Sequence, residues 1–165
     1  MNLKAISVVF IAGVTMLANA QTADKPIGVG ARVGAFFPTD KTTQNVGNTW
    51  LDLGIDFDVK KLTPSASLSL SLDYGYRESY RSLPLLLNYK VKRGSIYLLG
   101  GVGINFNKIP QTDGSTSGKT NFAYDLGIGY DVSTNGGAPI FIEGRFFGNK
   151  QSELNGFGAF IGIRL

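Results

Sequence analysis

The stretch that decides the fold is Ser67–Tyr76, which reads SLSLSLDYGY. Leucine and tyrosine occupy every even-numbered position, and serine, aspartate and glycine occupy every odd-numbered one. Successive side chains of a β-strand point to opposite faces. The alternation therefore predicts a strand with one apolar face and one face of small polar groups.

Seven other segments repeat this alternation, and turn-rich stretches separate them. A period of two over runs of this length is typical of strands and not of helices. We therefore predict eight strands, at Ile27–Phe37, Thr49–Val59, Ser65–Tyr76, Arg81–Val91, Ser95–Asn107, Thr120–Val132, Ile140–Phe147 and Gly156–Leu165.

The connections between the predicted strands also follow a pattern. Those after the even-numbered strands are short, namely Lys60–Pro64, Lys92–Gly94 and Ser133–Pro139. Three of the connections after the odd-numbered strands are longer and polar, namely Pro38–Asn48, Lys108–Lys119 and Gly148–Asn155. The connection after the third strand, Arg77–Tyr80, is short. Short turns at one end and longer loops at the other are typical of bacterial outer-membrane barrels, whose short turns face the periplasm.

The first twenty residues have the features of a cleaved signal peptide. Lys4 supplies a positive charge, Ala5–Leu17 is almost entirely apolar, and Ala18-Asn19-Ala20 is a cleavage site of small residues before Gln21. The apolar run is shorter than the roughly 20 residues that a membrane-spanning helix needs. We expect residues 1–20 to be removed on export and residues 21–165 to form one barrel domain.

Composition narrows the function further. The 165 residues are 43% apolar and only 17% charged, with 22 glycines and neither histidine nor cysteine. These values exclude a disordered chain, a disulfide scaffold, histidine- or cysteine-based catalysis and zinc sites of those residues. The net charge of +4 comes from scattered basic residues, which does not favour nucleic-acid binding. We expect neither an enzyme nor a cofactor.

Two motifs resemble ligand sites without matching them. Gly114–Thr120 reads GSTSGKT, which is one residue short of a phosphate-binding loop and precedes a predicted strand where a helix is needed. Asp52, Asp56 and Asp58 share one strand face, but their spacing matches no calcium loop. We interpret the first as an external loop and the second as part of a set of lumenal charges.

Alternation alone does not say which face of a barrel is inside. A soluble lipocalin-like barrel in the periplasm would place its apolar faces around a ligand cavity. Here the polar face consists mainly of glycine, serine and aspartate, which suit a narrow lumen and not a soluble exterior. Predicted strands of this length also match a tilted crossing of the bilayer. Both features favour apolar faces that contact outer-membrane lipid.

Aromatic residues gather near the strand ends on the apolar faces. Tyrosine and phenylalanine settle at membrane–water boundaries and form girdles there. We predict one girdle near the longer loops, at Phe37, Tyr74, Tyr76, Phe106, Phe122, Tyr124, Phe146 and Phe157, and one near the short turns, at Phe57, Tyr89 and Tyr130.

Charged residues of the strands fall on the opposite, inward face. Charges inside a closed barrel are costly unless they are paired and hydrogen-bonded. We therefore predict an ionic network that fills the lumen, without assigning its pairs, from Arg32, Asp52, Asp56, Asp58, Asp73, Lys90, Asp125, Asp131, Glu143, Arg145 and Arg164.

The sequence resembles the small eight-stranded outer-membrane β-barrel superfamily, which includes OmpA-type transmembrane domains and OmpX- and OmpW-like proteins. The resemblance covers residues 21–165 and rests on Leu83–Val91 (LPLLLNYKV), Tyr97–Gly103 (YLLGGVG), the alternating last strand and the signal peptide. It implies a closed, antiparallel, up-and-down transmembrane β-barrel, inserted as a monomer into the outer membrane by the barrel assembly machinery. Leu165 departs from the family's commonly aromatic last residue. Pro84 removes a ladder donor, so we expect a bulge or irregular pairing there.

Three functions fit this pattern. The first is a structural or surface-interaction role for an integral outer-membrane protein, through its longer loops and with contacts from Lys41, Trp50 and Tyr80. The second is a narrow channel for small solutes or ions. The third is the soluble periplasmic, lipocalin-like ligand-binding barrel.

Overall fold

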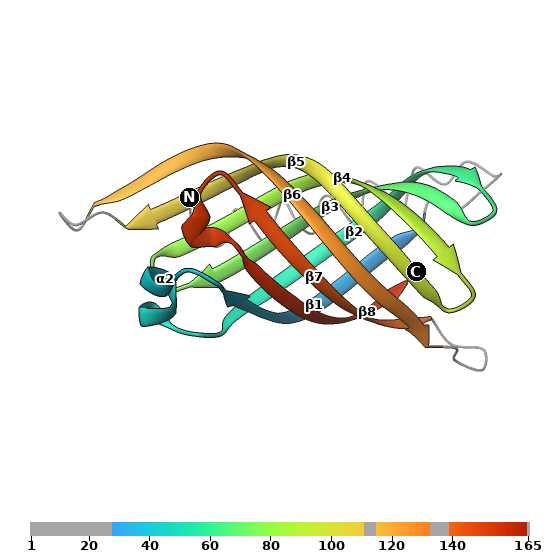
Figure 1. Ribbon diagram of the computed structural model, residues 1–165, viewed down its shortest axis with the longest axis horizontal. Helices are drawn as coiled ribbons and strands as arrows, with labels where there is room; N and C mark the ends of the chain where they lie inside the picture. Colours follow the sequence, from blue (N-terminus) through green and yellow to red (C-terminus); the bar gives the residue numbers. More distant parts are fainter. Residues whose placement is uncertain (1–27, 111–114, 133–138, 165) are drawn as a thin grey trace.

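The computed structural model describes residues 28–110, 115–132 and 139–164, which form one closed antiparallel barrel (Figure 1). Each strand pairs with its neighbours in the chain, and β1 closes the barrel against β8. The predicted fold of eight up-and-down strands is confirmed. The strands are β1 Val29–Pro38, β2 Trp50–Thr63, β3 Ala66–Arg77, β4 Tyr80–Arg93, β5 Ile96–Pro110, β6 Thr116–Val132, β7 Ile140–Asn149 and β8 Gly156–Arg164.

Closure gives every strand two hydrogen-bonded partners. The β1–β8 pairing runs from Gly30 opposite Arg164 to Pro38 opposite Gly156. A closed sheet has no unpaired edge, which is the condition for a β-structure to exist in lipid. The predicted signal peptide, residues 1–20, lies outside the described residues.

The two ends of the barrel differ in their connections. The loop end, on the left of Figure 1, carries α2 (Lys41–Val46) between β1 and β2 and the 3-10 helix η1 (Ser152–Leu154) between β7 and β8. At the opposite, turn end, short hairpins join β2 to β3 and β4 to β5; Gly94, in the second, has a φ of 62°, which glycine adopts without steric cost. No helix in the described ranges is long and apolar enough to cross a bilayer.

The strand boundaries differ from the predicted ones by up to four residues. β2 continues from Val59 to Thr63, and β6 begins at Thr116 and not at Thr120, so part of the predicted loop Lys108–Lys119 is strand. These extensions lack an alternating apolar face, because backbone hydrogen bonds between hairpin strands do not require one. Register shifts between Asp58 and Thr63 mark the bulges of the sheet that do occur.

Pro84 interrupts one ladder without shifting its register. The pairing of β3 with β4 stops at Leu72 opposite Leu85 and resumes at Gly75 opposite Ser82, in the same register. On the other side Pro84 pairs regularly with Asn105 of β5, whose side-chain oxygen accepts a hydrogen bond from the Leu83 N–H at 2.9 Å. The pairing is therefore irregular, as expected, but contains no bulge at this position.

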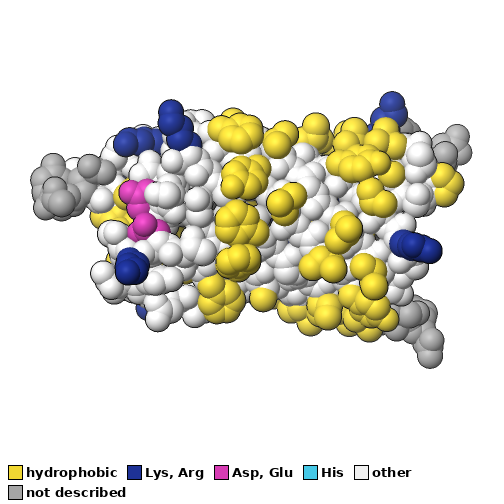
Figure 2. Space-filling model, viewed as in Figure 1, with side chains coloured by type: hydrophobic (Ala, Val, Ile, Leu, Met, Phe, Trp, Pro, Cys, Tyr) yellow, Lys and Arg dark blue, Asp and Glu magenta, His cyan; other side chains and the backbone are white. Residues whose placement is uncertain are grey.

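The apolar strand faces point outward. Leu126 is 61% exposed, whereas its neighbour Asp125 is 1% exposed. Figure 2 shows hydrophobic side chains spread over the middle of the barrel surface, with lysine and arginine toward its two ends. The lipocalin-like alternative required these leucines to line a cavity, and the orientation of the strands contradicts it.

Candidate functional site

Arg32 of β1 is fully buried in the middle of the lumen. Its guanidinium contacts Asp73 of β3, with Nη2 2.5 Å and Nε 3.1 Å from Oδ1, and it also forms an ion pair with Asp56 of β2. The ring of Phe160 lies 5.4 Å from the guanidinium carbon. Charge-assisted hydrogen bonds of this kind are the strongest that side chains form, and here they join three strands across the barrel.

Arg145 of β7 makes a second set of ion pairs beside the first. Its Nη1 lies 2.9 Å from Asp125, its Nη2 lies 3.3 Å from Asp56, and its Nε contacts Glu143. Asp56 therefore bridges both arginines. We call this set the central ion cluster; its members are Arg32, Asp56, Asp73, Asp125, Glu143 and Arg145.

Neutral side chains complete the hydrogen bonding of this cluster. The Tyr97 hydroxyl donates to Glu143 at 2.7 Å. Asn88 lies between Ser71 and Asp125, and its amide nitrogen reaches the Asp125 carboxylate at 2.7 Å in the orientation that satisfies both neighbours. Such partners reduce the cost of burying several carboxylates together.

A second layer of charges lies at the turn end. Asp131 of β6 accepts from Arg164 of β8 at 3.1 Å and from Lys92 of β4 at 2.5 Å, and Lys90 lies 3.9 Å from Asp58. The guanidinium of Arg164 also stacks over the rings of two buried aromatic residues, Phe141 at 4.6 Å and Tyr97 at 5.0 Å. Charge and aromatic rings together fill this part of the lumen.

The loop end of the lumen is filled by apolar side chains, which the sequence analysis did not predict. The rings of Phe36 and Trp50 lie 5.6 Å apart, and those of Trp50 and Tyr80 lie 5.5 Å apart. We call this set the apolar plug; its members are Phe36, Trp50, Tyr80, Leu86, Ile109, Ala123, Phe147, Leu154 and Phe160. The plug shows that the inner face is not uniformly polar.

Trp50 and Tyr80 were expected to contact other molecules from the loops, and the structure contradicts this expectation. They are only 1% and 5% exposed, because both point into the plug. The Trp50 indole N–H donates to the Gly47 carbonyl at 2.9 Å, which ties the end of α2 to the plug. Lys41, the third residue of that expectation, is exposed on α2. The sequence does contain one indication of this burial, because Phe36 and Trp50 fall on the inward parity of their strands.

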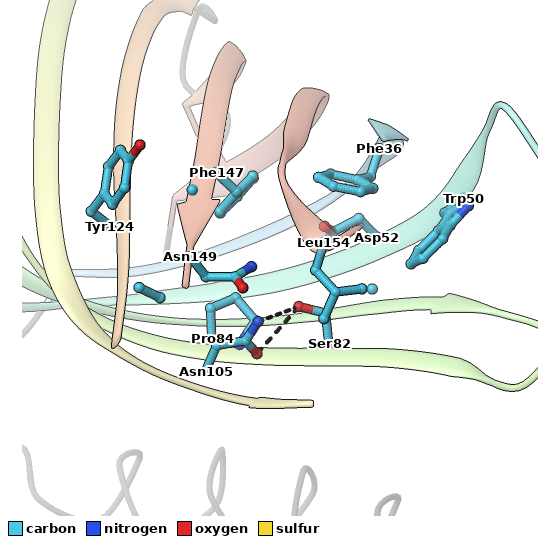
Figure 3. A pocket seen from close by; sticks show the side chains of 13 residues that line it. Phe36, Trp50, Asp52, Ser82, Pro84, Asn105, Tyr124, Phe147, Asn149 and Leu154 are labelled. Atoms are coloured by element: carbon cyan, nitrogen blue, oxygen red, sulfur yellow. Dashed lines mark hydrogen bonds between the residues drawn. The ribbon is translucent and has the colours of Figure 1, made fainter. Parts of the chain in front are cut away.

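Asp52 is the predicted network residue that has no cation. It is 4% exposed, and within the described part of the chain it forms no ion pair and its Oδ1 has no hydrogen-bond partner. It lines a cavity of about 20 Å³ beside the plug, together with Ser82, Asn105 and Asn149 (Figure 3). This volume is enough for a water molecule and too small for an organic ligand.

The predicted girdle residues all lie on the outer surface. Eight of them are exposed, from Tyr124 at 37% to Phe122 at 58%, and Phe57, Tyr74 and Phe146 are half-buried against neighbours. At the loop end their rings follow one another across three strands, at centroid distances of 6.5, 6.3 and 5.1 Å along Phe122, Tyr124, Phe146 and Phe157.

Solved structures with this fold are small outer-membrane barrels. The outer membrane protein Ail of Yersinia pestis superimposes with a TM-score of 0.54 at 11% identity, over 84% of this chain and 99% of Ail. Neisserial surface protein A gives 0.62 at 11% identity, over 84% and 96% of the two chains. The N-terminal β-barrel domain of Pseudomonas aeruginosa OprF gives 0.55 at 13% identity, over 83% and 95%.

No protein-family profile and no curated protein sequence matches the chain. Identities this low establish a common fold and nothing finer. The chain has the closed eight-stranded β-barrel fold of small outer-membrane proteins.

Proposed function

We propose that this chain is an integral outer-membrane protein of a Gram-negative bacterium, with residues 1–20 cleaved on export. The main support for the proposal is that apolar side chains lie outside and charged side chains inside, the reverse of the arrangement in a soluble protein. Leucine, isoleucine and valine side chains such as Leu126, Leu98 and Val102 are more than half exposed on the barrel wall, while aspartates are buried inside. A surface of this kind is stable only against lipid.

The role that fits best is structural or surface-interacting, without catalysis. Two layers of charge and one of aromatic rings lie across the lumen, and the cavity between their residues has room for about one water molecule. An eight-stranded barrel is just wide enough for its own side chains. These features support a sealed barrel over the alternative of a narrow channel.

Contacts with other molecules would then be made at the loop end. α2 carries exposed polar side chains, among them Lys41 and Gln44, and is anchored below by the buried Thr43 and by Trp50. A short helix fixed in this way presents a defined surface outside the membrane. We expect the protein to be monomeric, because closure leaves no unpaired strand edge, and to be inserted by the barrel assembly machinery.

Fractionation and gel mobility test this proposal. The protein should sediment with outer membranes, require detergent for release, and run faster on gels before boiling than after it. N-terminal sequencing of the purified protein should begin at Gln21. Recovery of the folded protein in the soluble periplasmic fraction would overturn the assignment.

Conductance across planar bilayers separates the sealed barrel from the channel. The purified protein, inserted in its folded form, should give no current above background. Reproducible single-channel steps from the wild-type protein would favour the channel instead.

A further inference from the structure

The charges of the barrel wall are segregated by sign. Among the strands that the structure describes, all seven acidic residues, including Asp73 and Glu143, lie on the lumenal parity. On the outward parity the charged residues are basic and lie toward the strand ends: Arg81 and Lys108 lie near the loop end, and Lys60 and Arg93 lie near the turn end. The outer face is therefore electrostatically suited to anions at its margins.

Arg81 and Lys108 are the sharpest instance, because they face each other directly. They are register partners on β4 and β5, so their side chains leave the wall side by side. Like charges placed opposite each other on neighbouring strands repel. No carboxylate of a described residue forms an ion pair with either of them.

The neighbours of this pair leave a partly walled space. Tyr76 is the register partner of Arg81 on β3, and its ring lies 5.9 Å from the guanidinium carbon. On the other side Lys108 is opposite Gly118 of β6, where an added Cβ would meet nothing closer than 3.8 Å. Arg81 and Lys108 thus lie side by side between the ring of Tyr76 and the open space beside Gly118.

The depth of this row identifies the anion. The next outward pair toward the bilayer is Leu83 and Phe106, and Phe106 belongs to the loop-end girdle. Aromatic girdles mark the level of the lipid headgroups. The two cations lie one step beyond Phe106 and level with Tyr76, at the outer margin of the girdle. Basic residues at this level of a membrane are attracted to the phosphates of lipid headgroups.

We infer that Arg81 and Lys108 form a binding site for a phosphate group of an outer-leaflet lipid. Arg81, held against Tyr76, offers its guanidinium edge to the phosphate oxygens, and Lys108 supplies a second positive charge from the adjacent strand. The lipid phosphate neutralises a cation pair that the protein leaves uncompensated. This inference rests on the proposed outer-membrane location.

Nanodiscs of zwitterionic phospholipid provide the test. The folded barrel is titrated with lipid A carrying its phosphates and with dephosphorylated lipid A, and retained lipid is counted by native mass spectrometry. We expect phosphorylated lipid A to bind at least tenfold more tightly. Arg81→Gln with Lys108→Gln should abolish that preference. The matched control, Lys60→Gln with Lys61→Gln, removes two exposed charges at the turn end and should retain it.

Each outcome has one meaning. Equal binding of the two lipids to the wild type, or an unchanged preference in the Arg81/Lys108 variant, overturns the inference. Competition by millimolar inorganic phosphate as effective as that by lipid A also overturns it, in favour of a free-anion site. A barrel that never enters the nanodiscs rejects the proposed function itself, whereas one that enters and ignores lipid phosphate rejects only this site.

Discussion

Arg32 and Arg145, on strands that are not neighbours, both donate hydrogen bonds to the carboxylate of Asp56. Glu143 also lies between them, in contact with Arg145 and 4.0 Å from Arg32. The negative charge of Asp56 offsets the repulsion between the two guanidiniums. The four carboxylates of the central ion cluster outnumber its two arginines, and each carboxylate contacts at least one guanidinium. Asp56 is the carboxylate of this cluster that accepts hydrogen bonds from both arginines.

Replacement of Asp56 by asparagine should therefore destabilise the barrel strongly. The substitution weakens one charge-assisted hydrogen bond of each of two buried guanidiniums, and such bonds contribute about 1.5–3 kcal/mol each. We therefore expect a loss of about 3–5 kcal/mol. Urea unfolding in lipid vesicles, followed by the gel-mobility shift, measures this loss. The control is Asp58→Asn, two residues along the same strand. The Asp58 side chain is 44% exposed and 3.9 Å from Lys90, so its loss should cost less than about 1 kcal/mol. Equal effects of the two substitutions would contradict the bridging role.

Asp52→Asn should have the opposite sign. Asp52 is as buried as Asp56 but has no cation in the described structure. Asparagine keeps the shape, and it removes a carboxyl group whose ionised form costs on the order of several kcal/mol to bury without a cation. The same urea assay should show unchanged or increased stability. A loss comparable with that of Asp56→Asn would mean that Asp52 is paired after all.

Fluorescence tests the position of Trp50, which is the sole tryptophan of the chain. Because it is 1% exposed and lies inside the barrel, its emission should be blue-shifted in the folded protein. Neither aqueous acrylamide nor lipids brominated on their acyl chains should quench it. Unfolding in urea should shift the emission to the red and restore quenching by acrylamide. Quenching by brominated lipid in the folded state would place the indole outside the barrel and contradict the apolar plug.

The sequence predicts the wall of this barrel better than its contents. A period of two is local information, so Ser67–Tyr76 alone indicates both a strand and the face that turns outward. Ion pairing is different, because it depends on the stagger with which the sheet closes. Arg32 of β1 contacts Asp73 of β3, and through Asp56 it is linked to Arg145 of β7. The sequence of a single strand contains no information about these distances.

The apolar plug was missed for a related reason. Phe36 and Phe37 are adjacent aromatic residues, and alternation assigns one of them inward without saying whether it packs or is exposed at the mouth. What makes Phe36 buried is its contact with Trp50 and Phe147, which come from β2 and β7. Such a cluster forms only when all the strands are assembled.

A charged residue introduced on the outer face of the barrel should lower its free energy of unfolding by an amount that depends on the depth of the residue in the bilayer. Leu126 lies midway along β6 and is 61% exposed, whereas Val132 ends the same strand and is 37% exposed on the same face. If lipid surrounds the barrel, Leu126→Arg should cost about 2–4 kcal/mol and Val132→Arg about 0–1 kcal/mol. Urea unfolding in vesicles measures both values. If this face contacted water, the more exposed Leu126 would tolerate arginine at least as well as Val132 does. A gradient from the strand centre to its end is therefore what a bilayer produces, and equal costs would show that lipid does not contact this face.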